Sequence, residues 1–168
     1  LASKIDYRKN KLRGAPVYFS PLDKETKINL DNLWLDLSGN ENQDFNIFVN
    51  KRKIKFPFYS NGVARFTFHE LCGENRGPAD FLAIADNVRV LIVEDIPQLG
   101  RSNFNEAKRF ITLIDTVYEA GIVFICSAAA QPEHLYLEGE GVFEFERTIS
   151  RLNEMQSESW GKSLNLSS

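Results

Sequence analysis

The sequence predicts a mixed α/β fold, in which an antiparallel β-meander is followed by a βαβ segment and a C-terminal helix. Apolar and polar residues alternate between residues 45 and 68, around an Asn-Gly turn signal. Further along, two continuous apolar runs enclose a helical stretch with one apolar stripe. With 168 residues, of which 43% are hydrophobic and 26% charged, the chain has an ordinary globular composition and can bury a core.

The first part of the chain is expected to contain a loop, a short strand, a short helix and the meander. Residues 1–16 are rich in Lys, Arg and Asn and predict a loop, whereas Val17–Phe19 predicts a strand. A helix is expected over Asp31–Leu37, with Gly39 as its stop. Phe45–Phe68 contains three alternating runs, and its Asn-Gly pair tolerates positive φ, so we expect three antiparallel strands there.

The second part changes to longer apolar runs and helical periodicity. Helices are expected over Pro78–Ala85, Asn105–Ala120 and Phe143–Gln156, and buried strands over Val88–Val93 and Ile122–Cys126. The order strand, helix, strand predicts a parallel pair with a right-handed crossover.

Net charge and cysteine usage exclude several classes of protein. The chain has 20 Lys and Arg against 23 Asp and Glu, so its net charge of −3 gives no general attraction to nucleic acid or membranes. Basic residues nevertheless gather within Lys4–Arg13 and Lys51–Lys55. Cys72 and Cys126 show no pairing motif, which is typical of a reduced, intracellular protein. No apolar run is long enough to span a membrane, and no signal peptide is present. Because the chain begins at Leu1, we expect it to be a piece of a longer protein.

An apolar strand that ends in Glu94-Asp95 has the shape of a Walker B segment, whose carboxylate reaches Mg²⁺. No P-loop precedes it, and acids at strand ends often serve as caps, so we favour a structural role. Gly161-Lys162-Ser163 completes only the end of a P-loop motif, because Gln156 stands where the first glycine belongs. His69 and His134 have no metal-binding company, so we predict neither a catalytic nor a metal site.

Two arginines are candidates for binding an anion. Arg147 and Arg151 lie four positions apart on the last predicted helix and therefore share a face. Like charges at this spacing repel unless an anion meets them, and the guanidinium fork matches phosphate oxygens. The alternative is a solvated face on which Glu154 and Glu158 neutralise the arginines.

The stretch NKRKIKFPFY (50–59) combines a basic turn with aromatic residues. Such a hairpin tip can bind an acidic partner or a single nucleic-acid strand. The alternative is a hairpin with its basic side chains in water and its phenylalanines in the core, where the charges discourage edge pairing.

Short motifs are spread over most of the chain: FTFHEL (66–71), GPADFLAIA (77–85), RFITLID (109–115), ICSA (125–128) and FERTISRLNEMQ (145–156). Together with the DYR triplet at residues 6–8 they resemble the ZapE/AFG-like ATPases, a family of bacteria and mitochondria. The R-T-x-S-R-L-x-E-M-Q-S run is the most specific of them, and the resemblance is weakest between residues 20 and 62.

The resemblance implies a P-loop NTPase-type domain whose P-loop and Walker B acids lie upstream of Leu1. It implies ATP and Mg²⁺ as cofactors of the full-length ATPase, with neither cofactor nor turnover expected in this chain alone. Arg147 and Arg151 match the R-T-x-S-R-L positions and are the predicted nucleotide contacts, with Arg109 as a third. The implied parts are residues 1–68 (loop, short helix and β-meander insertion), 69–162 (α/β part of the ATPase domain) and a frayed tail at 163–168.

The family also implies a partner and a place in the cell. We expect a protein client, or a division-associated or membrane-associated partner, and a homo-oligomer of the full-length protein. Neither stable membrane insertion nor nucleic-acid binding is expected. A bacterial member would be cytoplasmic, with membrane association as an option, and a eukaryotic one mitochondrial. The alternative function is a partner-binding module that uses the basic hairpin tip and has no catalytic role.

Overall fold

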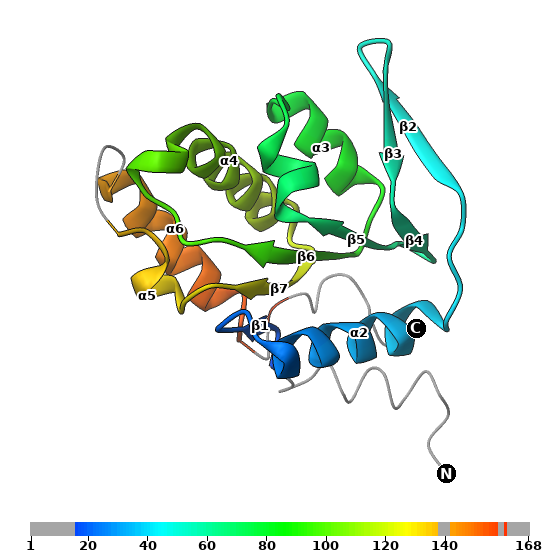
Figure 1. Ribbon diagram of the computed structural model, residues 1–168. Helices are drawn as coiled ribbons and strands as arrows, with labels where there is room; N and C mark the ends of the chain where they lie inside the picture. Colours follow the sequence, from blue (N-terminus) through cyan, green and yellow to red (C-terminus); the bar gives the residue numbers. More distant parts are fainter. Residues whose placement is uncertain (1–15, 138–141, 158–159, 161–168) are drawn as a thin grey trace.

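A five-stranded β-sheet lies at the centre of the molecule, in the order β1-β7-β6-β5-β4 (Figure 1). The computed structural model describes residues 16–137, 142–157 and 160. The strands are β1 (Tyr18–Phe19), β4 (Phe58–Ser60), β5 (Val63–Thr67), β6 (Val90–Ile96) and β7 (Val123–Ala128). Neighbours among β1, β7, β6 and β5 pair in parallel, and β4 pairs antiparallel to β5 at the edge. The mixed α/β fold class and the expected βαβ unit are therefore confirmed.

Helices cover both faces of this sheet. They are α2 (Lys24–Ser38), α3 (Pro78–Asp86), α4 (Phe104–Ala120), α5 (Pro132–Leu135) and α6 (Val142–Glu154), with a single π-turn over His69–Gly73 and a 3₁₀ turn over Arg101–Asn103. Helix α2 lies on one face, while α3, α4 and α6 lie on the other (Figure 1). None of the helices in the described part of the chain is long and apolar enough to cross a membrane.

Side chains that alternate along the central strands belong to two separate hydrophobic clusters, one on each face of the sheet. Val90 and Ile92 of β6 contact the cluster under α2, whereas Leu91 and Val93 contact the cluster under α3, α4 and α6. Both faces of the strand are covered, which explains why the sequence shows a continuous apolar run there.

The expected meander is replaced by two separate antiparallel hairpins. One is β2 (Phe45–Val49) with β3 (Arg52–Phe56), which forms its own two-stranded sheet; the other is β4 with β5. Pro57 interrupts the second of the three expected runs, between β3 and β4, since proline cannot donate to a strand ladder. β5 then pairs in parallel with β6, so strands from both sides of residue 68 share the central sheet. The Asn61-Gly62 turn is confirmed, with φ of 53° and 81°.

Helix positions agree with the sequence more closely than strand pairings do. α4 and α6 begin and end within two residues of the expected bounds, and Gly121 ends α4 at φ 70°. α2 is longer than expected, because the Asp23 carboxylate accepts a hydrogen bond from the Thr26 N–H (2.9 Å) and starts the helix earlier. The expected loop at the N-terminus, the DYR triplet and the 163–168 tail lie outside the described residues.

An ion-pair cluster, buried at Arg65 and Glu94, half-buried at Asp31 and exposed at Lys27, gives Glu94 a structural role. Arg65 of β5 donates to both Glu94 oxygens (3.0 and 2.9 Å) and to Asp31 of α2 (2.6 Å), and Lys27 lies 3.4 Å from Glu94. Burial opposes the charge on Arg65, but these carboxylates raise the pKa of its guanidinium. The strand does not end at the acids but continues to Ile96 through an irregularity after Val93. Glu94 therefore joins α2 to the sheet.

A second ion pair fixes the β2–β3 hairpin to the body. Arg52 Nη2 of β3 donates to both Asp80 oxygens of α3 (2.7 and 2.8 Å), and the Gly77 N–H donates to Oδ2 (2.8 Å). Burial acts to raise the pKa of Asp80, but the bonds from Arg52 and Gly77 lower it below its ordinary value.

Replacing Leu30 with alanine tests the packing of α2. Leu30 is fully buried, so we expect Leu30→Ala to lower the free energy of unfolding by about 2–5 kcal/mol. Leu35, on the same helix and 44% exposed, is the matched control, and its alanine variant should cost less than about 1 kcal/mol. Urea unfolding measures both; equal losses would contradict this placement of the helix.

The Arg52–Asp80 pair should make stability depend on pH. Because the folded pKa of Asp80 lies below the unfolded value of about 3.9, its contribution is present above that pH and is lost as pH falls through the folded pKa. We expect Asp80→Asn to be less stable than the parent at pH 7 and to lose less stability on acidification. Denaturation at a series of pH values below about 5 measures this; parallel curves would show that the pair contributes nothing.

Candidate functional site

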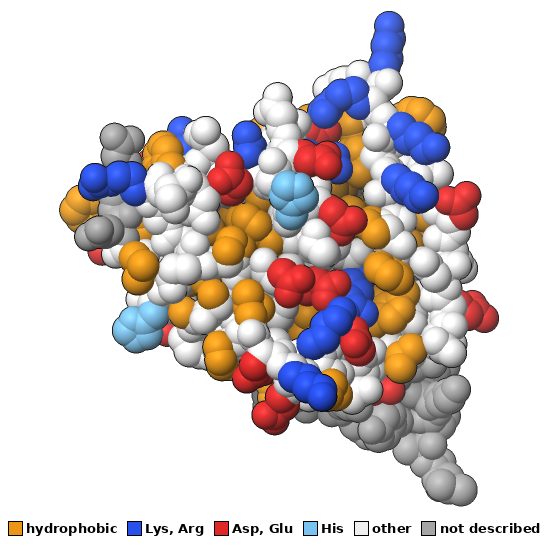
Figure 2. Space-filling view, in the orientation of Figure 1, with side chains coloured by type: hydrophobic (Ala, Val, Ile, Leu, Met, Phe, Trp, Pro, Cys, Tyr) orange, Lys and Arg blue, Asp and Glu red, His pale blue; other side chains and the backbone are white. Residues whose placement is uncertain are grey.

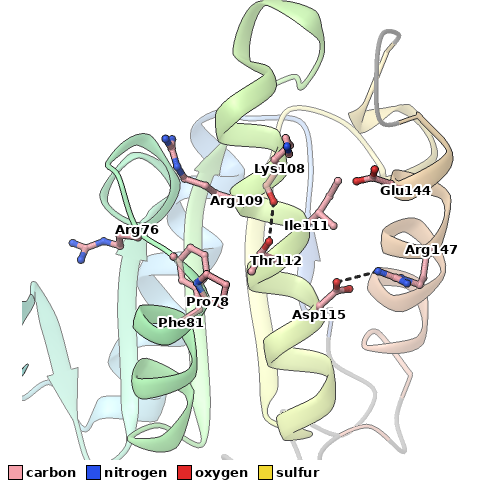
Figure 3. A pocket seen from close by; sticks show the side chains of 11 residues that line it. Arg76, Pro78, Phe81, Lys108, Arg109, Ile111, Thr112, Asp115, Glu144 and Arg147 are labelled. Carbon is pink, nitrogen blue, oxygen red and sulfur yellow. Dashed lines mark hydrogen bonds and ion pairs between the residues drawn. The ribbon is translucent and has the colours of Figure 1, made fainter. Parts of the chain in front are cut away.

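A groove between α3, α4 and α6 contains two of the three predicted nucleotide contacts (Figure 3). Its volume is about 280 Å³. Arg76, Gly77, Pro78 and Phe81 line it from the start of α3, Lys108, Arg109, Ile111, Thr112 and Asp115 from α4, and Glu144 and Arg147 from α6. Arg109 and Arg147, 38 positions apart in sequence, thus face one cavity.

The groove carries a surplus of positive charge. Its lining has four cationic side chains and two carboxylates. The Lys108 ammonium lies 5.4 Å from the centre of the Phe104 ring and forms no ion pair among the described residues. This excess of cations in the lining of one groove suits an anionic ligand, since it attracts phosphate or carboxylate oxygens.

One carboxylate, Asp115, holds both arginines of α6. Arg147 Nη2 donates to Asp115 Oδ2 (3.1 Å), and Arg151 Nη1 bonds to Oδ1 of the same carboxylate. Figure 3 shows the Asp115 side chain of α4 and the Arg147 side chain of α6 pointing toward one another. The repulsion expected between two arginines on one helix face is relieved by an acid on the neighbouring helix, and not by Glu154.

Arg151 is more tightly enclosed than Arg147. Its guanidinium carbon lies 4.6 Å from the centre of the Tyr118 ring, and Nη2 lies 3.6 Å from Glu119. The Tyr118 hydroxyl donates to Glu154 (2.9 Å), and this bond raises its pKa. Arg151 does not line the groove but sits one turn beyond it. Glu158, the other acid considered, lies outside the described residues.

Arg109 lies at the opposite wall. Its Nη1 donates to the Cys72 carbonyl (2.9 Å) and lies 3.8 Å from Glu106. Burial raises the pKa of the Cys72 thiol to about 12, although Arg109 and Arg76 oppose it, so this thiol is protonated at neutral pH and is no nucleophile.

Sequence reasoning missed four charged residues of the groove. Arg76 immediately precedes the Gly-Pro start of α3, Lys108 adjoins Arg109, Asp115 is the last residue of the RFITLID motif, and Glu144 lies in the first turn of α6. Asp115 carried a usable signal, because an acid that directly follows the apolar run of the RFITLID motif on the expected helix needs a partner.

A second cavity of about 590 Å³ lies where β5 and β6 end. Ligands often bind at this edge in open α/β sheets. The lining residues are Thr67, Phe68, His69, Gly73, Asp95, Pro97, Asn103 and Glu106, so its formal charges are acidic and do not favour a phosphate. In the described part of the chain no three His, Cys, Asp or Glu side chains come together as a metal site. The Gly161-Lys162-Ser163 match lies outside the described residues.

The fold and groove define an α/β domain with helices on both sheet faces and a cationic groove between its helices. The family model of the AFG1-like ATPases matches residues 1–163, and the chain belongs to this family. The family resemblance of the motifs is thereby confirmed.

Curated relatives extend from bacteria to vertebrates. The chain is 33% identical over 159 residues to the cell division protein ZapE of Escherichia coli, with 94% of this chain and 42% of that protein covered. It is 34% identical to an uncharacterized protein of Schizosaccharomyces pombe (95% and 42% covered) and 24% identical to lactation elevated protein 1 homolog B of Danio rerio (95% and 39%). The chain thus spans about two fifths of the length of these relatives. No solved structure matches it significantly.

Removing the shared carboxylate should loosen α6. We expect Asp115→Asn to lower the free energy of unfolding by about 1–2 kcal/mol, because two arginines lose their anion at a partly exposed site. Asp86→Asn, an exposed acid at the end of α3, is the matched control. Thermal unfolding compares the two; a similar small effect for both would show that the ion pairs do not hold α6.

Proposed function

We propose that the longer protein to which this chain belongs binds ATP with Mg²⁺ and hydrolyses it, to remodel or chaperone a protein client. The family match over residues 1–163 carries this proposal, since the matched family is one of ATPases. The 168 residues contain no G-x-x-x-x-G-K-[S/T] motif, and phosphoryl transfer needs that loop, its lysine and Mg²⁺. We therefore assign the P-loop to another part of the longer protein.

In this proposal the groove supplies cationic contacts to the nucleotide phosphates. Arg147 is the first candidate, because its side chain is 61% exposed and its bond to Asp115 engages one terminal nitrogen of a guanidinium that has five N–H donors. Arg109 faces the same cavity from α4 and is the second candidate. Both stand on helices, which hold side chains more rigidly than loops do.

Arg151 has a different place in the proposal. Its guanidinium is 19% exposed, lies against Tyr118 and is shared between Asp115 and Glu119. We therefore assign it a positioning role: it orients Asp115, which in turn orients Arg147.

The remaining parts of the proposal concern the cell. The client is a division-associated or membrane-associated protein, because the Escherichia coli relative is named for cell division. The longer protein assembles as a homo-oligomer and works in the bacterial cytoplasm, or in mitochondria if it is eukaryotic.

This chain by itself should neither bind ATP tightly nor hydrolyse it. Calorimetric titration with ATP and Mg²⁺ should give no heat of binding below about millimolar nucleotide, since the P-loop amides are missing. Micromolar binding that is lost in Arg151→Ala would contradict the proposal and would place a complete nucleotide site within these residues.

In the longer protein, Arg147→Ala should lower kcat for ATP hydrolysis by about 10- to 100-fold, the usual effect of losing a charged hydrogen bond to the transition state. Arg101→Ala removes an exposed arginine outside the groove and is the matched control. Steady-state kinetics with a parallel unfolding measurement separates catalysis from folding. If both variants keep the parent kcat, the groove does not contact the nucleotide.

A further inference from the structure

The β2–β3 hairpin projects from the body of the molecule at the end of the sheet that is remote from α5 and α6 (Figure 1). Its turn residues Asn50 and Lys51 both have positive φ (50° and 69°), the conformation of a tight two-residue hairpin turn. Because side chains alternate along a strand, this ribbon has an inner and an outer face with different chemistry.

The inner face is apolar and held by the body. Val49, Ile54 and Phe56 are buried in the main core cluster, with Phe45 and Ile47 packed against it. Arg52 belongs to this face and is bound by Asp80 of α3. One of the four basic residues of the tip therefore has a structural partner.

The outer face presents lysines around one aromatic side chain. Phe48 pairs with Lys53 across the two strands, and Asn46 with Lys55, while Lys51 stands in the turn. Phe48 is 72% exposed, and all three lysines are exposed and form no ion pair among the described residues. No acid occurs between residues 45 and 56. In Figure 2 the blue side chains gather over this hairpin.

We propose that this outer face, formed by Phe48, Lys51, Lys53 and Lys55, docks on an anionic membrane surface. Lysine stems lie along apolar material while their ammonium groups reach the headgroups, and a phenylalanine between them enters the boundary between headgroups and acyl chains. The outer face carries three lysines and no acid, so it attracts anionic headgroups although the chain as a whole has a net charge of −3.

Composition favours lipid over two other anionic partners. Protein interfaces are enriched in arginine and depleted of lysine. On this hairpin Arg52 is bound to Asp80, and the exposed cations of the outer face are all lysines. Single-stranded nucleic acid is usually bound by successive stacking aromatics, whereas this face presents Phe48 alone. Protection of strand edges explains exposed lysines but not an exposed phenylalanine between them.

The test uses the 168-residue chain and sedimentation with phosphatidylcholine vesicles containing about 30% phosphatidylserine. We expect binding that is lost on pure phosphatidylcholine and at about 0.5 M salt. Neutralising Lys53 and Lys55 together (Lys53→Gln, Lys55→Gln) should weaken partitioning about 25-fold, fivefold for each charge. Phe48→Ser should weaken it about tenfold.

Two matched variants control for charge and for exposed aromatic surface. Lys24→Gln with Arg101→Gln makes the same change in net charge on exposed residues elsewhere, and Phe143→Ser removes a phenylalanine that is 85% exposed at the start of α6. Both should bind vesicles like the parent chain.

Several results would overturn the proposal. The first is that the chain does not bind the anionic vesicles, and the second is that the hairpin and control variants lose binding equally. The third is that the chain binds a single-stranded oligonucleotide or polyglutamate through Phe48 and Lys53 but does not bind vesicles. Thermal unfolding of each variant checks that its fold is intact. The result is independent of ATP hydrolysis, so either proposal can fail without the other.

Discussion

Burial of the central strands on both faces is the constraint on which the rest of the structure depends. β5, β6 and β7 pair in parallel, and their alternate side chains need cover above and below. Helix α2 supplies one cover, and α3, α4 and α6 supply the other. The charges that enter this sheet must be paired where they are buried, which is why Arg65, Glu94 and Asp31 form one cluster that also joins α2 to the strands.

The same packing creates the groove. α3 and α4 cover adjacent parts of one sheet face, and α6 lies against α4, so residues from three separate segments of the chain line one cavity. At this groove the Asp115 carboxylate accepts hydrogen bonds from both Arg147 and Arg151 and so offsets part of their positive charge. The carboxylate balances the charge of the two arginines, and Arg147 keeps N–H donors that its bond to Asp115 does not engage.

Local signals predicted the elements, whereas pairing of distant strands needed the structure. The stripe of α4 and its glycine cap set the helix where it was expected, and the β6 and β7 runs were recognised as buried strands. Phe45–Phe68 was assigned to one meander because alternation shows strands but not their partners. Pro57 was the overlooked local signal, and the parallel pairing of β5 with β6 involves residues far apart in the chain.

The sequence by itself determined the fold class, the family and most helix bounds, because periodicity, caps and short motifs act within a few residues. It also named Arg109, Arg147 and Arg151, but not their surroundings. Only the tertiary structure decided that two of them share a groove, that Asp115 holds the α6 pair, and that Arg52 is bound while its neighbouring lysines are presented outward. These contacts join segments that are far apart in the sequence and meet only after the helices and strands pack. The distances between their charged groups are therefore set by the fold.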